Sequence, residues 1–359
     1  VIYFQLCDSS ELSNSKDMDR SDLFHRFIYA AIIPLVFVSL CFILPPFFII
    51  KFLKNILRYF FHRENMEGKV VLITGAASGI GEQMAYEYAK KGASLVIVDK
   101  RGDNLPKVVE RARELGSPAV LPVSADVSNV NDCKRFVDEA INHFGRLDHL
   151  VNNAGIGLIC VIEDATDVTK FAPLMDVNFW GSVYSTHFAI PHLKKTKGKI
   201  VVISSASALL HPPRLGFYVA SKSALISFFE TLRVELAPAI KITIVTPGFI
   251  DTEMARGKHY KKGVIKEDLK QMRNDMIQSL PLMSSRACAK SIVDGVGRGE
   301  RYVTEPKWYK VFFMLETLCP ELVEWYYHTF YFTKRSGTSK MVAATNLASI
   351  PPSQTTKTD

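Results

Sequence analysis

Six short apolar runs constrain the fold of this chain more than any other feature. They are rich in β-branched residues and read KVVLIT, SLVIVD, AVLPVSAD, LDHLVNNAG, GKIVVISS and IKITIVTPG. Strands this apolar belong in a parallel sheet that is covered on both faces. The stretches between the runs, such as GEQMAYEYAKKG and VNDCKRFVDEAINHFG, are typical of crossover helices. The sequence therefore predicts an α/β domain with a doubly wound parallel sheet over residues 67–299.

The first run leads into a glycine-rich turn. The segment TGAASGIG places Gly75, Gly79 and Gly81 between an expected strand and an expected helix. Glycine permits a tight turn, and backbone N–H groups at the start of a helix can bind a pyrophosphate. Asp99 ends the next strand about 20 residues later, where dinucleotide sites carry an acidic residue. We therefore predict a Rossmann domain that binds a dinucleotide.

The residues around Asp99 bear on which nicotinamide cofactor is used. A carboxylate there can accept hydrogen bonds from the ribose hydroxyls of NAD, and it repels the 2′-phosphate of NADP. Lys100 and Arg101 follow directly, and a basic residue there can bind that phosphate. Both NAD(H) and NADP(H) stay open, and we favour NAD(H).

A second group of residues predicts oxidoreductase chemistry. Tyr218 and Lys222 stand four apart in a helix-like segment, so their side chains share one helix face. A nearby ammonium lowers the pKa of a phenol toward working pH. Oxidation of a hydroxyl to a carbonyl needs such a base, because the alcohol proton must leave as hydride moves to the cofactor. Ser204 and Ser205 end an earlier strand and complete the group.

In this order, the glycine turn, the NNAG segment, the Ser-Ser strand end and the Tyr-x-x-x-Lys pair resemble the short-chain dehydrogenase/reductase superfamily, from about Gly68 to Tyr260. The resemblance implies that Tyr218 is the general acid/base and that Lys222 lowers its pKa and binds the nicotinamide ribose. It also implies that Ser205, thirteen residues before the tyrosine, polarises the substrate oxygen. Asn178, in MDVNFWGSV, matches the asparagine that holds a proton-relay water.

The same resemblance implies which residues contact the substrate and the cofactor. Ser205 and Tyr218 are the expected substrate contacts. The implied cofactor contacts are Gly75, Ser78, Gly79, Ile80, Gly81, Asp99, Lys100, Asp126, Val127, Asn152, Ala154, Gly155, Tyr218, Lys222, Pro247, Gly248 and Thr252.

Four segments flank the expected domain. They are a polar lead (1–26), a proline-bearing hydrophobic anchor (27–66), an aromatic C-terminal element (300–334) and a Ser/Thr/Pro-rich tail expected to be disordered (335–359). Residues 1–17 precede the first methionine and are either part of a longer protein or translated upstream sequence, so we exclude them from fold predictions. The aromatic element either packs on the domain or forms a surface for lipid or a partner subunit.

The anchor contains an adjacent pair of prolines, Pro45 and Pro46. Charge is absent from Phe27 to Ile50, and these 24 residues as a helix would extend about 36 Å, enough to cross a hydrocarbon core of about 30 Å. Proline, however, removes a backbone donor and clashes with the preceding turn. A straight or kinked transmembrane helix and a hairpin bent at the prolines both stay open, and we favour the hairpin.

Composition excludes several other classes of function. The six cysteines form no Cys-x-x-Cys pair and the nine histidines show no metal-binding spacing, which argues for a reducing compartment and against a metal site. The net charge of +8 is spread along the chain without a basic block, so we expect no nucleic-acid binding. A mild basic excess is compatible with an anionic membrane surface.

The proline-bearing run, the segment YVTEP with Trp308 shortly after it, and the dehydrogenase core together are similar to the plant 11β-hydroxysteroid dehydrogenase-like proteins, the steroleosins of seed oil bodies. This similarity runs from about Phe27 to Lys334. It implies a sterol or steroid alcohol or ketone as substrate. It also implies a location on lipid droplets or the endoplasmic reticulum membrane, with the catalytic domain in the cytosol, and a homodimer.

Substrate choice in such enzymes lies in variable segments, here 157–170, 206–217 and 250–281, which contain aliphatic and aromatic residues. Two alternatives stay open at this point. One is a dehydrogenase for another lipid, such as a retinoid, a fatty aldehyde or a sphingoid ketone. The other is a structural coat protein of lipid droplets whose dehydrogenase domain is a relic.

Overall fold

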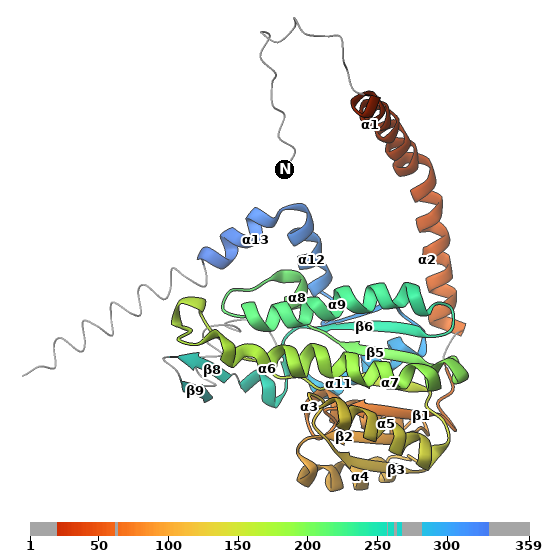
Figure 1. Cartoon of the computed structure of the whole chain (residues 1–359). Coiled ribbons are helices and arrows are strands. Elements are labelled where there is room, and N and C mark those ends of the chain that lie inside the picture. Colours follow the sequence, from red (N-terminus) through yellow and green to blue (C-terminus); the bar gives the residue numbers. More distant parts are fainter. Residues whose placement is uncertain (1–19, 62–63, 257, 262–263, 268–281, 330–359) are drawn as a thin grey trace, which may run out of the picture. The chain divides into compact units, whose positions relative to one another are not determined.

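The computed structural model describes residues 20–61, 64–256, 258–261, 264–267 and 282–329 (Figure 1). It divides into two units, Val1–Arg63 and Glu64–Asp359. The division lies close to the boundary at residue 67 that the sequence predicts between anchor and domain.

Seven parallel strands form the central sheet of the second unit, in the order β11-β6-β5-β4-β1-β2-β3. The strands are β1 (Val70–Thr74), β2 (Ser94–Asp99), β3 (Val120–Ser124), β4 (His149–Asn152), β5 (Lys199–Ile203), β6 (Lys241–Pro247) and β11 (Tyr302–Glu305). The predicted doubly wound Rossmann fold is confirmed. Strand order reverses between β1 and β4, the point at which such sheets bind ligands. Because β11 belongs to this sheet, the domain end predicted at residue 299 is one strand too early.

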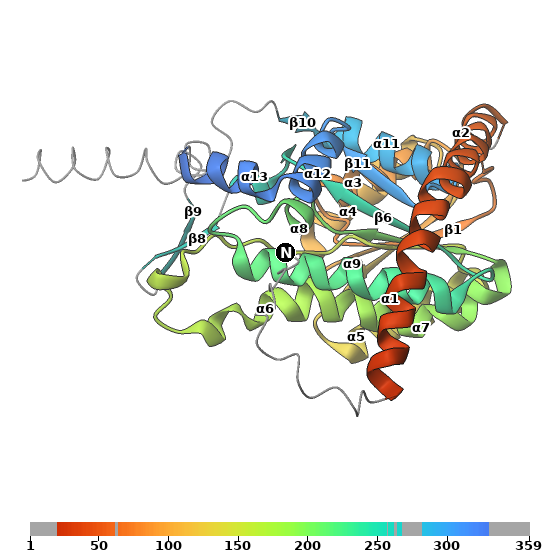
Figure 2. The ribbon, with the colours of Figure 1, turned by 90° about the horizontal axis from the view of Figure 1, so that it is seen from above.

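Helices cover both faces of the sheet, as Figure 2 shows. One layer contains α3 (Gly79–Ala89), α4 (Leu105–Glu114) and α11 (Ser285–Gly297), and the other contains α5 (Val130–Phe144), α7 (Gly181–Thr196) and α9 (Gly216–Leu236). Within β1, Val71 and Ile73 join the first core, whereas Val70 and Leu72 join the second. Side chains alternate between the faces of a strand, so a strand buried on both faces is apolar throughout. This is why these strands read as continuous apolar runs.

Smaller elements complete the second unit. The helices are α6 (Ala172–Met175), α8 (Ser207–Leu210), α12 (Tyr309–Leu318) and α13 (Pro320–Tyr327), and the short strands are β7 (Ile250–Asp251), β8 (Lys258–Lys261), β9 (Val264–Glu267) and β10 (Met283–Ser284). Single turns are η2 (Gly102–Asn104), η3 (Ile162–Asp164), η4 (Val168–Phe171), η5 (Asp176–Trp180) and η6 (Glu253–Arg256).

The first unit is helical through the proline pair. Helix α1 (Arg20–Val38) passes through a π-helical turn, η1 (Ser39–Ile43), into α2 (Leu44–Phe61). In that turn the Leu44 N–H bonds the carbonyl of Ser39, five residues back, so the helix is widened directly before Pro45 and Pro46. Because the widened turn accommodates the prolines without reversing the chain, the predicted hairpin is wrong.

This helix is long and apolar enough to cross a membrane. The candidate span, Ser21–Leu53, has 33 residues and a mean hydropathy of 2.7, and none of it is buried. At 1.5 Å per residue it would extend about 50 Å, longer than a hydrocarbon core of about 30 Å.

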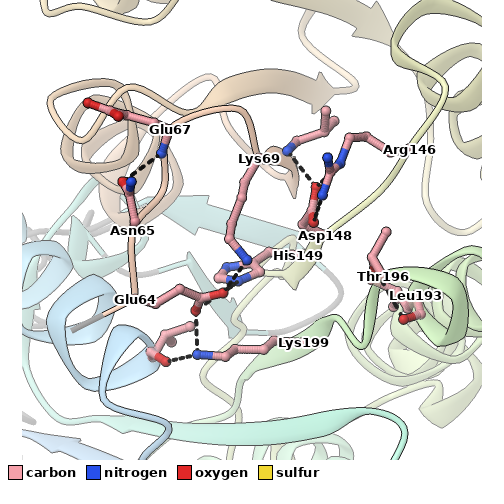
Figure 3. Close-up of polar contacts among 12 residues, drawn as sticks. Glu64, Asn65, Glu67, Lys69, Arg146, Asp148, His149, Leu193, Thr196 and Lys199 are labelled. Carbon is pink, nitrogen blue, oxygen red and sulfur yellow. Dashed lines mark hydrogen bonds and ion pairs between the residues drawn. The ribbon is translucent and has the colours of Figure 1, made fainter. Parts of the chain in front are cut away.

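A partly buried ion cluster lies at the amino-terminal ends of the strands (Figure 3). The Glu64 carboxylate pairs with Lys69 Nζ at 2.6 Å, with Lys199 Nζ at 2.5 Å and with His149 Nε2 at 3.3 Å. Burial opposes ionisation of Glu64, but these partners hold the pKa of its carboxyl well below its usual range. Burial lowers the pKa of His149 and favours its neutral form. The cluster attaches the first residue of the second unit to the starts of β4 and β5.

Candidate active site

The glycine turn after β1 has a geometry that requires glycine. Gly75 and Gly79 have φ angles of +66° and +60°. A Cβ on Gly81 would lie 2.2 Å from the carbonyl oxygen of Gly75. Asn153 fixes the turn, because its Nδ2 donates to the carbonyls of Thr74 at 2.9 Å and Gly75 at 3.0 Å. Asn153 is absent from the predicted site residues, although it stands in the NNAG segment that led to them.

The turn opens directly onto the start of α3. Ser78 occupies the position before the helix, and in the described part of the chain its side chain makes no capping bond to that helix. Its Oγ instead accepts a hydrogen bond from Arg101 Nη2 at 2.6 Å. The first N–H groups of a helix, here from Gly79 onward, have no partners within the helix. This is a geometry that suits a pyrophosphate.

Asp99, at the end of β2, holds the turn from the other side. Its Oδ2 accepts from the Ala77 N–H at 3.0 Å, and its Oδ1 accepts from the Arg101 N–H at 2.9 Å. The guanidinium of Arg101 also donates to Glu253 at 2.7 Å. Arg101 therefore lies between Asp99, Ser78 and Glu253. The set of cofactor contacts predicted from sequence omits Arg101, although it directly follows Lys100.

Asp126 and Val127 follow β3 in the same region. Lys100 Nζ donates to Asp126 at 2.5 Å, and Ser128 donates both its N–H and its hydroxyl to that carboxylate. Burial opposes ionisation of Asp126, but these bonds hold its pKa below the usual value. Val127 is buried, and its side chain lies against Gly181, where a Cβ would come within 2.8 Å of it.

The NNAG segment after β4 is divided between core and site. The buried Asn152 donates through Nδ2 to Thr186 Oγ1 at 2.8 Å, so its side chain is bound to α7. The structure therefore does not bring this predicted contact to the glycine turn through its side chain. Gly155 is different, because a Cβ there would lie 3.1 Å from Asn178 Oδ1 and 3.2 Å from Lys222 Nζ.

Tyr218 and Lys222 lie together on α9. Lys222 is buried, its Nζ is 5.9 Å from the centre of the Tyr218 ring, and it donates to the carbonyl of Ile203 at 2.9 Å. Burial lowers the pKa of Lys222 to about 8. Burial raises the pKa of Tyr218, and a hydrogen bond from Ser205 opposes that rise.

The two adjacent serines have different surroundings. Ser204 is buried, and its Oγ donates to the carbonyl of Lys222 at 2.8 Å, which joins β5 to α9. Ser205 is partly exposed, and it is the serine whose side chain opposes the rise in the pKa of Tyr218. Ser205 is therefore the serine that the structure brings to the tyrosine.

Asn178 lies in the π-helical turn η5 and is completely buried. Its Oδ1 accepts from the Ile156 N–H at 2.8 Å, and its Nδ2 donates to the Ile156 carbonyl at 3.0 Å and to Ser221 Oγ at 2.9 Å. The side chain therefore joins the loop after β4 to α9, next to Tyr218.

The end of β6 forms the remaining edge of the site. The carbonyl of Pro247 accepts from the Ala206 N–H at 2.8 Å. A Cβ on Gly248 would lie 2.0 Å from the Tyr309 ring of α12. The Thr252 methyl would lie 3.3 Å from a Cβ on Gly79, so this segment reaches the glycine turn.

Apolar side chains pack beside Tyr218. Phe217 stacks on Phe171 with ring centres 4.1 Å apart, and Leu158 and Cys160 belong to the same cluster. The predicted substrate segments 157–170 and 206–217 thus contribute side chains to an apolar cluster that includes Tyr218. Residues 268–281 of the third predicted segment lie outside the described residues.

Residues 69–263 match the family model of short chain dehydrogenases. The chain belongs to this family. As a short-chain dehydrogenase it is an NAD(P)-dependent oxidoreductase, and the predicted family is confirmed. The match spans the glycine turn, the NNAG segment, Ser205 and the Tyr218–Lys222 pair.

Relatives of this short-chain dehydrogenase include plant proteins named as hydroxysteroid dehydrogenases. The chain is 53% identical over 300 residues to 11-beta-hydroxysteroid dehydrogenase 1A of Arabidopsis thaliana, covering 83% of this chain and 85% of that protein. It is 51% identical over 312 residues to 11-beta-hydroxysteroid dehydrogenase A of Sesamum indicum, covering 86% and 88%.

Solved structures resemble it as well. A short-chain dehydrogenase/reductase from Burkholderia phymatum in complex with NAD has a TM-score of 0.64 and 26% identity, covering 72% of this chain and 96% of that one. An alcohol dehydrogenase from Thermococcus sibiricus, complexed with 5-hydroxy-NADP, has a TM-score of 0.56 and 25% identity, covering 66% and 94%.

The residues of this short-chain dehydrogenase fit a nicotinamide dinucleotide. A Cβ on Gly81 would collide with the carbonyl of Gly75, so only glycine lets the turn close tightly against the start of α3, which offers backbone donors. Asp99 and Arg101 lie at the side of the turn, where an adenosine ribose is bound in this type of fold.

Proposed function

We propose that this enzyme interconverts a hydroxyl and a ketone on a sterol- or steroid-like substrate, with Tyr218 as the acid/base. The observation that carries the proposed acid/base role is the placement of the buried Lys222 on the same helix as Tyr218, with its Nζ 5.9 Å from the Tyr218 ring centre. When bound, the nicotinamide cofactor supplies or accepts the hydride.

In the oxidative direction, Tyr218 as phenolate takes the proton of the substrate hydroxyl while the carbon-bound hydrogen leaves as hydride. In the reverse direction, the phenol returns that proton to the oxygen of the ketone. Burial alone would keep Tyr218 protonated, because it raises the pKa of the phenol. The Lys222 ammonium and a hydrogen bond donated by Ser205 both favour the phenolate. With substrate bound, the single Ser205 proton is donated to the substrate oxygen in place of Tyr218, and Asn178 holds the adjoining loop on α9.

Two observations support a sterol-like substrate. The surroundings of Tyr218 are apolar, with Leu158 and Phe217 packed around the buried Phe171, which favours an apolar substrate. Relatives at 53% and 51% identity carry the name 11-beta-hydroxysteroid dehydrogenase.

The proposal is tested by a substrate panel with the purified full chain. Sterol and steroid alcohols, a retinol, a long-chain alcohol and a sphingoid base are each incubated with NAD or NADP, and reduced cofactor is followed by its absorbance. We expect turnover of at least one sterol or steroid alcohol, with the highest kcat/KM in that class. A preference for retinol, the long-chain alcohol or the sphingoid base would contradict the substrate assignment and leave the chemistry in place.

For the cofactor we propose a preference for NAD(H) over NADP(H). The two basic residues able to bind a 2′-phosphate are both engaged by carboxylates, Lys100 by Asp126 and Arg101 by Asp99 and Glu253. These five side chains carry one more negative than positive charge. A dianionic phosphate is therefore disfavoured relative to a ribose hydroxyl.

We further propose that the enzyme is held at a lipid surface, a lipid droplet or the endoplasmic reticulum membrane, with its catalytic domain in the cytosol. The apolar helix Ser21–Leu53, in which no residue is buried, supports this. So does an apolar stripe on the outer faces of α12 and α13. Its exposed members are Val311, Phe312, Met314, Leu318, Leu322, Trp325 and Tyr326. An exposed face of this kind on two adjacent helices is typical of a contact with lipid or protein.

A fluorescent fusion of the full chain tests this location. We expect it to surround neutral-lipid droplets or to label the endoplasmic reticulum, and we expect a version that lacks residues 21–53 to lose that distribution. Diffuse fluorescence of the full chain would contradict the proposal.

A further inference from the structure

Ser207 contacts the hydroxyl of Ser205 twice. The Ser207 N–H donates to Ser205 Oγ at 3.2 Å, and Ser207 Oγ donates to the same oxygen at 2.9 Å. Ser207 is the first residue of α8, so this N–H has no partner within its own helix. The oxygen of Ser205 therefore serves as the acceptor for the start of the helix.

This contact restricts what the Ser205 hydroxyl can do. A serine hydroxyl has one proton to donate and two lone pairs that accept. Ser207 supplies a donor for each lone pair, so Ser205 is left to act as a donor. Among the described residues, the backbone oxygen within reach of the Ser205 proton is the carbonyl oxygen of Pro247, 3.5 Å from Ser205 Oγ. That distance is long for a hydroxyl donor, so the Ser205 proton stays available for the oxygens in the site.

The segment that carries Ser207 is itself held on three sides. The Ala206 N–H donates to the carbonyl of Pro247 at 2.8 Å, and Ser223 Oγ of α9 donates to the carbonyl of Ala208 at 3.1 Å. Leu210 packs in one buried cluster with Tyr309 of α12. The position of the Ser207 hydroxyl is therefore fixed before any substrate binds.

We propose that Ser207 is a positioning residue, which saturates the acceptor sites of Ser205 and so directs its one proton into the site, to Tyr218 in the free enzyme and to the substrate oxygen once substrate is bound. The proposal rests on the catalytic role proposed above for Ser205. In a site without Ser207 Oγ, the Ser205 hydroxyl can rotate and accept a bond instead of donating one, which removes stabilisation of the charge that develops on oxygen.

The test is a double-mutant cycle on the full chain. The variants are Ser207→Ala, Ser207→Thr, Ser205→Ala and the double variant Ser205→Ala/Ser207→Ala, each assayed for single-turnover hydride transfer with a steroid alcohol and for cofactor Kd. We expect Ser207→Ala to lower the rate about tenfold, the worth of one hydrogen bond, with the cofactor Kd unchanged. Ser207→Thr keeps the hydroxyl and should restore the rate to within about twofold.

The decisive arm is the double variant. If Ser207 acts through Ser205, then adding Ser207→Ala to Ser205→Ala should change the rate less than about twofold. A full tenfold further loss, or a Ser207→Ala variant as fast as the wild type, would overturn the proposal. If Ser205→Ala alone kept the full rate, the failure would lie with the proposed role of Ser205. Thermal unfolding of each variant separates a folding defect from a loss of rate.

Discussion

At the scale of single residues, the environment of Lys222 has the largest consequence for the proposed chemistry. Its ammonium is buried, lies 5.9 Å from the Tyr218 ring centre and has a pKa lowered to about 8 by burial. Lys222 is therefore fully protonated well below pH 8 and loses its proton as pH rises through that value. Tyr218 stays protonated over the same range, because burial raises its pKa.

This difference predicts a pH dependence in the reductive direction. The kcat/KM for ketone reduction should fall as pH rises through about 8, because that quantity follows ionisation of the free enzyme. Lys222→Arg should be slower overall, but its alkaline limb should move to higher pH, since a guanidinium keeps its proton there. If the fall in kcat/KM occurred at the same pH in the wild type and in Lys222→Arg, the group that titrates would not be Lys222.

A second residue-scale prediction concerns cofactor preference. Glu253→Gln removes one carboxylate from Arg101, whose Nη1 it contacts at 2.7 Å, and leaves the guanidinium more able to bind a 2′-phosphate. The ratio of kcat/KM for NADP to that for NAD should rise about tenfold, as expected for a charged hydrogen bond gained. Asp251→Asn, an exposed carboxylate two residues away, is the matched control and should leave the ratio unchanged. A similar shift in both variants would point to the net charge of the region instead.

At the scale of elements, β1, β2, β4, β5 and β6 could be predicted because strands buried on both faces have continuous apolar sequences, whereas the edge strand β3 is apolar but only partly buried. β11 was missed because it is short and carries buried polar residues. Thr304 Oγ1 bonds Thr246 Oγ1 at 2.9 Å, and Glu305 bonds Ser291. Thr246 and Ser291 lie outside the strand and its flanking residues, so no local sequence pattern predicts β11.

The site residues also divide into those that local sequence patterns predict and those that depend on the fold. Tyr218, Lys222 and the glycines were predictable because their spacing is itself the chemical requirement. Asn153 and Ser207 were not predicted because their roles depend on bonds that only the fold creates, and Arg101 was named as a basic residue near Asp99 without its bonds to Ser78 and Glu253. In the anchor, the proline pair led to the prediction of a hairpin, because no sequence pattern indicated the π-helical turn that precedes Pro45 and Pro46.

The widened turn leads to a prediction about the anchor. Since the helix already passes through the prolines, Pro45→Leu/Pro46→Leu should leave association with membranes or droplets unchanged. The check is sedimentation after extraction at alkaline pH, with deletion of residues 21–53 as the control that releases the protein. Release of the double-leucine variant would mean that the prolines bend the chain in the lipid.

At the scale of the whole molecule, the cluster around Glu64 ties stability to pH. The folded-state pKa of Glu64 lies below its ordinary value of 4.5, and that of His149 lies below 6.5. In both cases the unfolded chain binds more protons in the window beneath the ordinary value. The contribution of these two groups to the free energy of unfolding is therefore fully present above those values. It is lost as pH falls, first below 6.5 as His149 resists protonation in the folded chain, and then below 4.5 as Glu64 does.

Thermal unfolding from pH 7.5 to 4 tests this account. The wild-type Tm should fall as pH decreases below about 6.5. Glu64→Gln should lower stability at pH 7.5 by on the order of 2 kcal/mol, because Lys199 loses its partner, and should reduce the further loss below pH 4.5. Glu67→Gln, at an exposed position nearby, is the control. A Glu64→Gln profile that parallels the wild type would exclude Glu64 as the source.

The account as a whole depends on proton transfer by Tyr218. The most direct measurement is single-turnover hydride transfer from a sterol or steroid alcohol by wild type and Tyr218→Phe, each with cofactor Kd measured by fluorescence. Loss of the phenol should slow transfer at least about a hundredfold, with cofactor binding within about threefold of the wild type. A Tyr218→Phe enzyme that transfers hydride at the wild-type rate would contradict the central claim.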